Sequence, residues 1–407
     1  MSVPLVTLTH NVKETDLAYN ETDTVRRESE AIALARVLCI GGVVYVHAWT
    51  GLDGDSLEAA RGTWQENMRW VLMEIFGRSA VPLLGIISGY LVAGSRRVTD
   101  WRLHVTRKAR TILLPMVLWN ALALLFVCGA AILLGLAAPT PKSLGWTLQE
   151  LLIVTHPPDI NVQMPFLRDL FLCMVIAPLL TRLPTQALAA LACLAGLGHV
   201  LELGAPVILR ISILMFFILG ILARRHSFAR QIEGLPLRVV ALPFLMLIAM
   251  KVSLEVVPSL APDVLRMKHM MAALDLLLRI SAAGFFWKLA WKLAGWEGRG
   301  FLLRLEPYAF FYFAAHLIVI WLGGPLLGKL TGKLGAPLYP LGLIAQPFLV
   351  LGVVLASANL LLRFAPAAAE VLSGGRLHRP RPAARPAVEK AMAMPPIDLQ
   401  RTGKKLH

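Results

Sequence analysis

Two ionisable residues in the first hydrophobic stretch are the best candidates for chemistry. Arg36 and His47 are eleven positions apart, about three turns of an α-helix, so they share one helical face. A lone histidine in a helix is more often a packing residue, but His47 heads an acidic loop and stands above a buried arginine. Imidazole has an ordinary pKa near the working pH, which suits it to take a proton from a hydroxyl group. The pattern therefore predicts that His47 is a general base.

A second polar pair, Arg168 and Asp169, opens a later apolar run. Asp169 can orient an imidazole, and Arg168 can hold an anionic group or a developing oxyanion. The same two residues can equally form an ion pair at a helix end that stabilises the packing of the bundle. The pattern leaves both interpretations open.

Other charged residues inside apolar runs come in pairs four positions apart. Glu74 and Arg78 form one such pair, and Asp275 and Arg279 form another, and this spacing places each pair on one helical face. We interpret both mainly as structural ion pairs. His316 follows the aromatic run 310–313 and can line the same cavity as His47. The four cysteines show no zinc or haem spacing, so we expect no metal site.

The composition places these residues in membrane-spanning helices. The chain is 57% hydrophobic and only 16% charged, with a mean hydropathy of +0.65, whereas a soluble domain has roughly 45–50% apolar and about 25% charged residues. The net charge of +15 does not indicate nucleic-acid binding, because the basic residues occur in short blocks between apolar runs. We therefore expect the protein to contact membrane lipid and no nucleic acid.

The apolar runs predict an all-α integral membrane protein, a bundle of about ten transmembrane helices. A spanning helix needs about 20 predominantly apolar residues. The runs are 31–49, 70–93, 111–137, 166–180, 185–201, 206–223, 239–256, 270–287, 307–327 and 337–362.

The distribution of lysine and arginine predicts the orientation, because cytoplasmic loops retain these residues. With both termini in the cytoplasm, 27 of the 40 basic residues fall in cytoplasmic segments and 7 in outer ones. The loop after the first run is acidic, with Asp53, Asp55, Glu58 and Glu66. We therefore expect both termini to be cytoplasmic and His47 to lie toward the outer side.

The chain divides into three predicted parts. Residues 1–30 are a polar cytoplasmic segment, residues 31–363 form the transmembrane domain, and residues 364–407 are a basic cytoplasmic tail rich in proline and alanine. Such a composition favours disorder in the tail. The polar residues at the start are not those of a secretory signal, so we expect the first apolar run to be a retained helix.

Five segments, in order along the chain, carry a resemblance to a known family. They are 35–47, 76–91, 107–119, 166–171 and 312–316. Together they resemble membrane acyltransferase family 3, whose members O-acylate bacterial polysaccharides and other sugars. The resemblance covers roughly residues 31–363, and segments 87–91 and 166–170 are most similar to members of the succinoglycan and exopolysaccharide succinyltransferase type.

The resemblance implies a catalytic site and a donor site. His47 matches the family's catalytic histidine, and Arg36 matches its arginine on the first helix. The family's cytoplasmic motif has two arginines four apart; here Arg107 and Arg110 are three apart with Lys108 between them, so this match departs from the pattern. We expect Arg36, Arg107, Lys108 and Arg110 to bind an acyl-CoA co-substrate, succinyl-CoA or acetyl-CoA.

The resemblance further implies a function at the bacterial inner membrane. We expect an O-acyltransferase that moves a succinyl or acetyl group from cytoplasmic acyl-CoA to a sugar hydroxyl of an exopolysaccharide or lipid-linked oligosaccharide, with contact to the polysaccharide assembly machinery. A multi-pass transporter or flippase for a glycan is the alternative, because buried Arg, Glu, Asp and His suit it equally well.

Overall fold

The computed structural model describes residues 6–78, 80–203, 207–256 and 267–378, and within these ranges it contains helices and no strands. The helices are α1 (Val6–Val46), α2 (Gly54–Ala59), α3 (Trp64–Leu72), α4 (Ala80–Ala93), α5 (Trp101–Lys108), α6 (Leu114–Ala123), α7 (Gly129–Leu134), α8 (Leu144–Leu152), α9 (Pro165–Leu180), α10 (Thr185–Val200), α11 (Ile211–Arg225), α12 (Phe228–Gly234), α13 (Leu237–Val256), α14 (Lys268–Ala294), α15 (Arg299–Leu303), α16 (Ala309–Thr331), α17 (Tyr339–Phe364) and α18 (Pro366–Leu372). The predicted all-α class is confirmed.

The number of spanning helices differs from the predicted ten. Seven helical stretches of the described chain are long and apolar enough to cross a membrane, or eight if the pair α11 and α12, bent by 77°, forms one span. Each of the ten predicted runs does contain a helix. However, α9 and α10 have 16 residues each and α11 has 15, fewer than the roughly 20 that a straight span needs.

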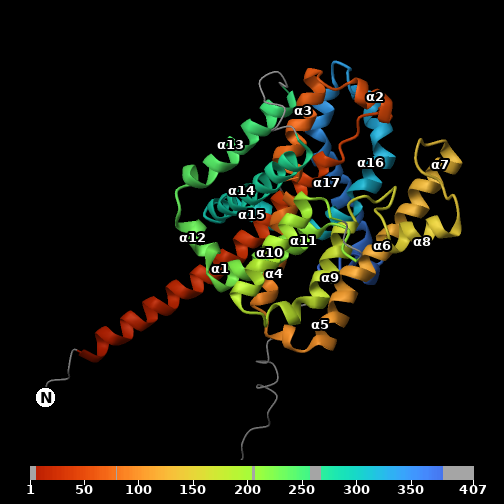
Figure 1. Cartoon of the computed structure of the whole chain (residues 1–407). Helices are drawn as coiled ribbons and strands as arrows, with labels where there is room; N and C mark the ends of the chain where they lie inside the picture. The colour runs from red at the N-terminus through yellow and green to blue at the C-terminus, as the bar shows by residue number, and fades with distance from the viewer. Residues whose placement is uncertain (1–5, 79, 204–206, 257–266, 379–407) are drawn as a thin grey trace, which may run out of the picture.

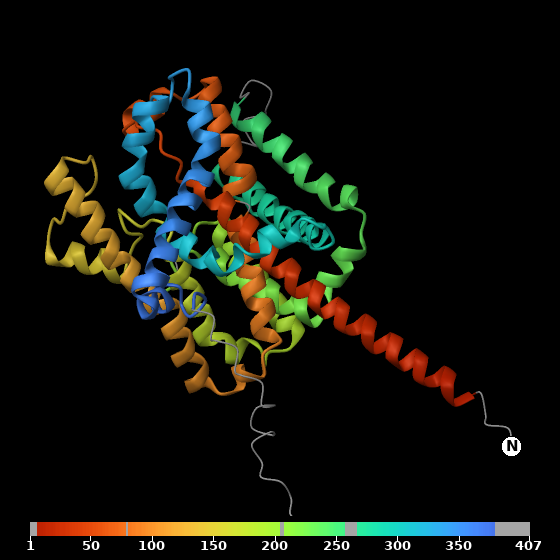
Figure 2. The ribbon, with the colours of Figure 1, turned by 180° about the vertical axis from the view of Figure 1, so that it is seen from behind.

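The two predicted sides of the protein lie at opposite ends of the bundle. Both views show α2 and α3 beside the tops of α16 and α17, and α5 at the other end (Figures 1 and 2). Residues of the acidic loop therefore lie far from the basic segment that follows α4.

The first helix is longer than the sequence predicts. Helix α1 starts at Val6 and continues without a break to Val46, so the polar residues before Ala31 extend the same helix. Its N-terminal half projects away from the bundle (Figures 1 and 2). The buried Glu28 accepts hydrogen bonds from the Tyr90 hydroxyl at 2.6 Å and from Arg224 at 3.0 Å, so the polar segment is anchored where it enters the bundle.

Close helix crossings hold the interior together. Gly42 on α1 lies against the π-helical turn η1 (Met73–Arg78), where an added Cβ would stand 2.1 Å from the Phe76 carbonyl oxygen. Gly89 on α4 meets α11 in the same way, with an added Cβ only 1.9 Å from the Phe217 carbonyl oxygen. Only glycine allows backbones to approach this closely, as in other membrane helix pairs. These crossings determine which faces of α1 and α4 border the interior.

The first residues of the predicted tail form a helix that packs on the bundle. Residues Pro366–Leu372 form α18, and the indole nitrogen of Trp119 donates a 2.9 Å hydrogen bond to the Leu372 carbonyl. Leu377 is only 3% exposed. Apolar residues here find a partner in α6, which composition alone does not reveal. The rest of the predicted tail, 379–407, lies outside the described residues.

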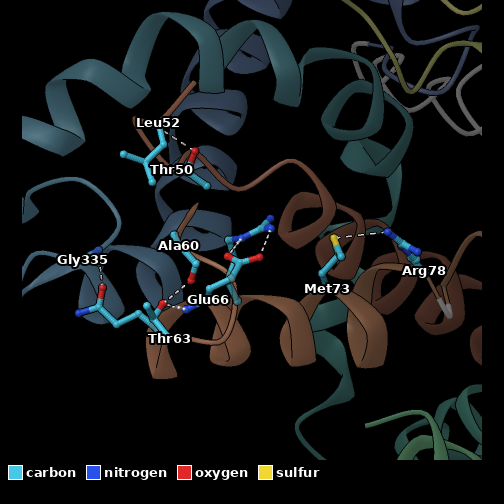
Figure 3. A network of polar contacts seen from close by, with 10 residues as sticks. Thr50, Leu52, Ala60, Thr63, Glu66, Met73, Arg78 and Gly335 are labelled. Carbon is cyan, nitrogen blue, oxygen red and sulfur yellow. Dashed lines mark hydrogen bonds and ion pairs between the residues drawn. The ribbon is translucent and has the colours of Figure 1, made fainter. Parts of the chain in front are cut away.

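At the end of the bundle that carries α2 and α3, hydrogen bonds join the α2–α3 region to the connection between α16 and α17. The Gly335 amide donates to the Gln65 side chain at 2.6 Å (Figure 3). The Leu334 amide donates to the Thr50 carbonyl at 2.9 Å. A bidentate contact between Arg69 and Glu66, at 2.6 and 2.7 Å, stiffens α3 beneath them. The chain that follows His47 is thereby held in place.

Candidate active site

A cavity of about 790 Å³ occupies the end of the bundle that carries α2 and α3, and His47 lies in its wall. Its polar lining includes ionisable side chains from six segments of the chain: His47, Arg78, His199, Glu202, Arg210, Lys251, Glu255, Lys268, Asp275 and Arg279. A cavity of several hundred Å³ suits a small-molecule or sugar substrate. We call it the outer cavity, after the side that the sequence predicts.

The end of α1 places His47 at this wall. Helix α1 ends at Val46, and the His47 amide still donates to the Val44 carbonyl at 3.1 Å. Two residues later the Trp49 amide donates to the Gln346 side chain at 3.1 Å, which ties the chain to α17. The Trp49 ring lies so close to Gly324 that an added Cβ there would stand 2.3 Å from it. The backbone on both sides of His47 is therefore fixed.

His316 on α16 lies beside His47. The centroids of the two imidazole rings are 5.4 Å apart and their planes are tilted by 36°. His316 is 1% exposed, and its Nδ1 lies 2.7 Å from the Phe313 carbonyl oxygen. The structure therefore places the two histidines of the predicted cavity next to each other.

The charged pairs predicted to be structural form one connected network. Arg78 contacts Glu74 at 3.0 Å and Arg279 contacts Asp275 at 2.6 Å, which confirms both pairs. Lys251 on α13 joins them, with its ammonium 2.6 Å from Glu74 and 2.7 Å from Asp275. Each carboxylate is therefore shared by two cations along one side of the outer cavity.

Arg210 is the cation of the outer cavity without a carboxylate partner among the described residues. Its backbone amide donates to Asp169 at 2.8 Å, while its side chain is exposed and borders the cavity, with no ion pair to a described carboxylate. Such a guanidinium can bind a carboxylate or a phosphate through two parallel hydrogen bonds.

Arg168 and Asp169 are not among the residues that line either cavity, although Asp169 accepts hydrogen bonds from the backbone of two residues that do. Asp169 is fully buried and accepts hydrogen bonds from Arg168 at 2.7 Å and from the backbone amide of Leu209 at 3.3 Å. Arg168 also donates to the Val154 carbonyl at 3.2 Å. Asp169 thus joins the start of α9 to the chain that enters α11, and neither side chain contacts His47. These contacts fit the helix-end alternative, and they also position Arg210.

A second cavity, of about 910 Å³, lies on the other side of the bundle, and we call it the inner cavity. Its charged lining consists of Arg36, Arg97, Arg107, Lys108, Arg376 and one acid, Glu306. Three of the four residues predicted to bind the donor, Arg36, Arg107 and Lys108, are among them, whereas Arg110 is not. An excess of cations in a concave site attracts and holds phosphates.

Arg376 enters this cavity from the segment after α18. Its guanidinium lies 4.3 Å from the centre of the Phe310 ring, a cation–π distance, and donates to the Ser373 carbonyl at 2.9 Å. Burial and the nearby Arg36 lower the pKa of Arg376 to about 10, so it remains cationic at neutral pH.

Arg36 pairs with Glu306 at 2.9 Å, at the edge of the inner cavity. Glu306 comes from the short 3₁₀ turn η7 (Glu306–Tyr308) before α16. Arg36 is therefore partly neutralised by a residue that lies 270 positions away in the sequence. Arg36 on α1 thus lines the inner cavity, and His47, directly after the end of α1, lines the outer cavity.

Two aromatic side chains line both cavities. Phe166 on α9 and Phe313 on α16 border the outer and the inner cavity. Their rings meet edge to face, with centroids 5.7 Å apart. The two cavities therefore approach each other at this pair, in the middle of the bundle, with Phe313 three residues before His316.

Several site residues were not predicted. Arg210, Lys251, Glu306 and Arg376 have no motif that marks them, and only their charge within or beside an apolar run distinguishes the first two. An intramembrane charge is a functional candidate by default. Which of these charges meet, however, depends on how the helices pack.

The amino-acid sequence matches a known family and one curated protein. A family model described as an acyltransferase domain matches residues 29–363. Among curated proteins, the chain is 30% identical over 382 residues to the succinoglycan biosynthesis protein ExoH of Rhizobium meliloti (strain 1021), a match that covers 88% of this chain and 95% of that protein. No solved structure matches the chain.

Proposed function

We propose that this chain, which belongs to the acyltransferase family whose domain it matches, transfers an acyl group to a sugar hydroxyl of an exopolysaccharide. One observation carries the proposal: His47 lies in the wall of one cavity, and a second, cationic cavity approaches it from the opposite side at Phe166 and Phe313. Such an arrangement supports transfer between a donor on one side and an acceptor on the other.

The acyl donor is a coenzyme A thioester that enters the inner cavity. Its phosphates contact Arg107, Lys108 and Arg376, and its thioester end points toward Phe313. Arg36 lies along this path, and Glu306 holds its guanidinium at the edge of the cavity. Arg110 lies outside this lining, so we place it in no direct contact with the donor.

The acceptor hydroxyl binds in the outer cavity, next to His47. A ring nitrogen of His47 takes the hydroxyl proton while the sugar oxygen attacks the acyl carbonyl carbon. The carbon–oxygen bond forms, the carbon–sulfur bond breaks, and the leaving thiolate receives a proton from the imidazolium. Ten ionisable side chains line this cavity among its apolar ones, which suits the hydroxyl groups of a polysaccharide or lipid-linked oligosaccharide.

The acyl group is succinyl rather than acetyl in this proposal. Arg210 provides the support, because it is a cation of the His47 cavity that no described carboxylate neutralises. Arg168 was the expected partner for this carboxylate, but its guanidinium is already occupied by Asp169 and by the Val154 carbonyl. We therefore assign the terminal carboxylate to Arg210 and a positioning role to Arg168 and Asp169.

The orientation in the inner membrane is part of the proposal. We place ten membrane passes and both termini in the cytoplasm, with α9, α10 and α11 crossing as short or tilted helices. Reporter fusions in the loop at 53–66 are expected to read as periplasmic, and fusions at 97–107 as cytoplasmic. A cytoplasmic reading at 53–66 would place His47 on the wrong side and refute this orientation.

The proposed function can be tested by comparing the exopolysaccharide of a strain that lacks this protein with that of the wild type. Mass spectrometry of the exopolysaccharide is expected to show full-length repeat units that lack one acyl group. A carrier is the second candidate, because two cavities that meet at one aromatic pair also suit alternating access. Loss of the whole polymer, with its precursor retained inside the cell, would favour that carrier and refute the acyltransferase.

A further inference from the structure

His316 has one ring nitrogen with a hydrogen-bond partner and one without. Nδ1 lies 2.7 Å from the Phe313 carbonyl oxygen, whereas Nε2 is buried and has no partner among the described residues. A carbonyl oxygen only accepts hydrogen bonds, so Nδ1 carries the proton. In a neutral ring, Nε2 is then the acceptor, with a lone pair.

An unpartnered buried acceptor is uncommon in a folded protein. Leaving such a group unsatisfied costs roughly 1–3 kcal/mol, and most buried polar atoms have a partner. The His316 position therefore calls for a donor that this structure does not supply, and the question is which neighbouring group can provide one.

The His47 ring is the neighbour that can donate. It lies 5.4 Å from the His316 ring, centroid to centroid, and its nitrogens make no hydrogen bond to any described residue. No hydrogen bond joins the two rings here, and their planes are tilted by 36°. His47 borders the outer cavity, so its ring is packed by protein on only part of its surface, and a rotation of the side chain toward Nε2 would form the bond.

We propose that His316 is a positioning residue, whose Nε2 accepts the ring N–H of His47 and so keeps the other His47 nitrogen unprotonated and turned toward the outer cavity. A neutral imidazole has one N–H and one lone pair, so fixing the first determines where the second points. His316 thus has the role that a carboxylate has in many hydrolases, and the sequence-predicted carboxylate, Asp169, is engaged elsewhere.

The same hydrogen bond stabilises the positive charge that His47 carries during the reaction. When His47 takes the hydroxyl proton it becomes an imidazolium, and its hydrogen bond to Nε2 becomes charge-assisted and stronger. No proton needs to pass to His316, because Nδ1 keeps its own. The inference rests on the proposed function, in which His47 is the general base.

Two amide substitutions separate positioning from structure. In His316→Asn, the side-chain amide can still donate to the Phe313 carbonyl, in place of Nδ1, but nothing replaces Nε2. In His316→Gln, the longer side chain can place its carbonyl oxygen near the Nε2 position. We expect the Asn variant to lose about 10–100-fold in kcat with unchanged KM for both substrates, and the Gln variant to recover most of it.

A merely structural histidine predicts the reverse order. If the Asn variant were fully active and the Gln variant had a lower activity and a lower melting temperature, the positioning role would be overturned. Equal activity in both variants would also overturn the positioning role, because an acceptor at the Nε2 position would then be irrelevant. Equal loss of activity in both variants, with wild-type melting temperatures, would overturn it as well, because an acceptor at that position would then be insufficient.

A measurement on the unmodified protein keeps the test independent of how the variants fold. The ¹⁵N shifts of histidine-labelled protein in detergent, with His47 assigned by its absence in His47→Ala, should show one neutral His47 tautomer. An equal mixture of tautomers would contradict the inference. If His47→Ala itself kept full activity, the proposed function would fail instead, so the two failures are distinguishable.

Discussion

Replacement of His47 by alanine is expected to abolish acyl transfer while leaving the protein folded and the polymer exported. The ring has no hydrogen bond to any described residue and borders a cavity, so its loss removes little packing. A general base contributes typically 10²–10⁴-fold to the rate. We therefore expect a decrease of that order in the transfer rate of purified protein, and no measurable acyl group on the polymer of cells.

Two further variants make this test specific. His47→Gln keeps a polar side chain of similar size but cannot take up a proton, and it should be as inactive as the alanine variant. His226→Ala changes an exposed histidine that stacks on Phe228, away from both cavities, and should leave the rate unchanged. Wild-type acyl content in His47→Ala would exclude His47 as the base.

Replacement of Arg210 by glutamine is expected to impair succinyl transfer much more than acetyl transfer. A hydrogen bond to a charged group contributes about 1.5–3 kcal/mol, so transfer from succinyl-CoA should fall by about one to two orders of magnitude. Acetyl has no terminal carboxylate and should lose only a few-fold at most. The measurement is the rate of transfer from each donor, by the same purified variant.

Arg168→Lys serves as the matched control for Arg210. Lysine cannot reproduce the contacts of Arg168 with Asp169 and with the Val154 carbonyl at once. We expect it to reduce transfer from both donors alike and to lower the melting temperature in detergent. If Arg168→Lys were selective for succinyl and Arg210→Gln were not, the carboxylate would belong to Arg168, as the sequence first indicated.

The helices and the positions of most charges follow directly from the sequence. Runs of apolar residues predicted where helices lie, because a bilayer requires every backbone group to be bonded within its own segment. The i, i+4 spacing predicted the pairs Glu74–Arg78 and Asp275–Arg279, since neighbours on one helix face meet whatever the rest of the fold does. The count of spans did not follow, because α9, α10 and α11 are shorter than their apolar runs suggested.

Contacts between helices were decided by the tertiary structure alone. Nothing in the local pattern links Arg36 to Glu306, or Lys251 to Glu74 and Asp275, because these residues lie far apart in sequence. Asp169 illustrates the same limit: the local pattern left a catalytic and a helix-end role open, and its two further hydrogen bonds go to the backbone amides just before α11.

The sequence determined some features of the candidate site, and the packing of the helices determined others. The sequence determined that His47 and Arg36 share a face of one helix, because helical periodicity alone sets that relation. The tertiary structure decided that His316 is the neighbour of His47, that Arg210 is the unpaired cation beside it, and that Phe166 and Phe313 stand between the two cavities. The physical reason is that the rotation and crossing of packed helices depend on close approaches such as Gly42 against Phe76, which no single segment specifies.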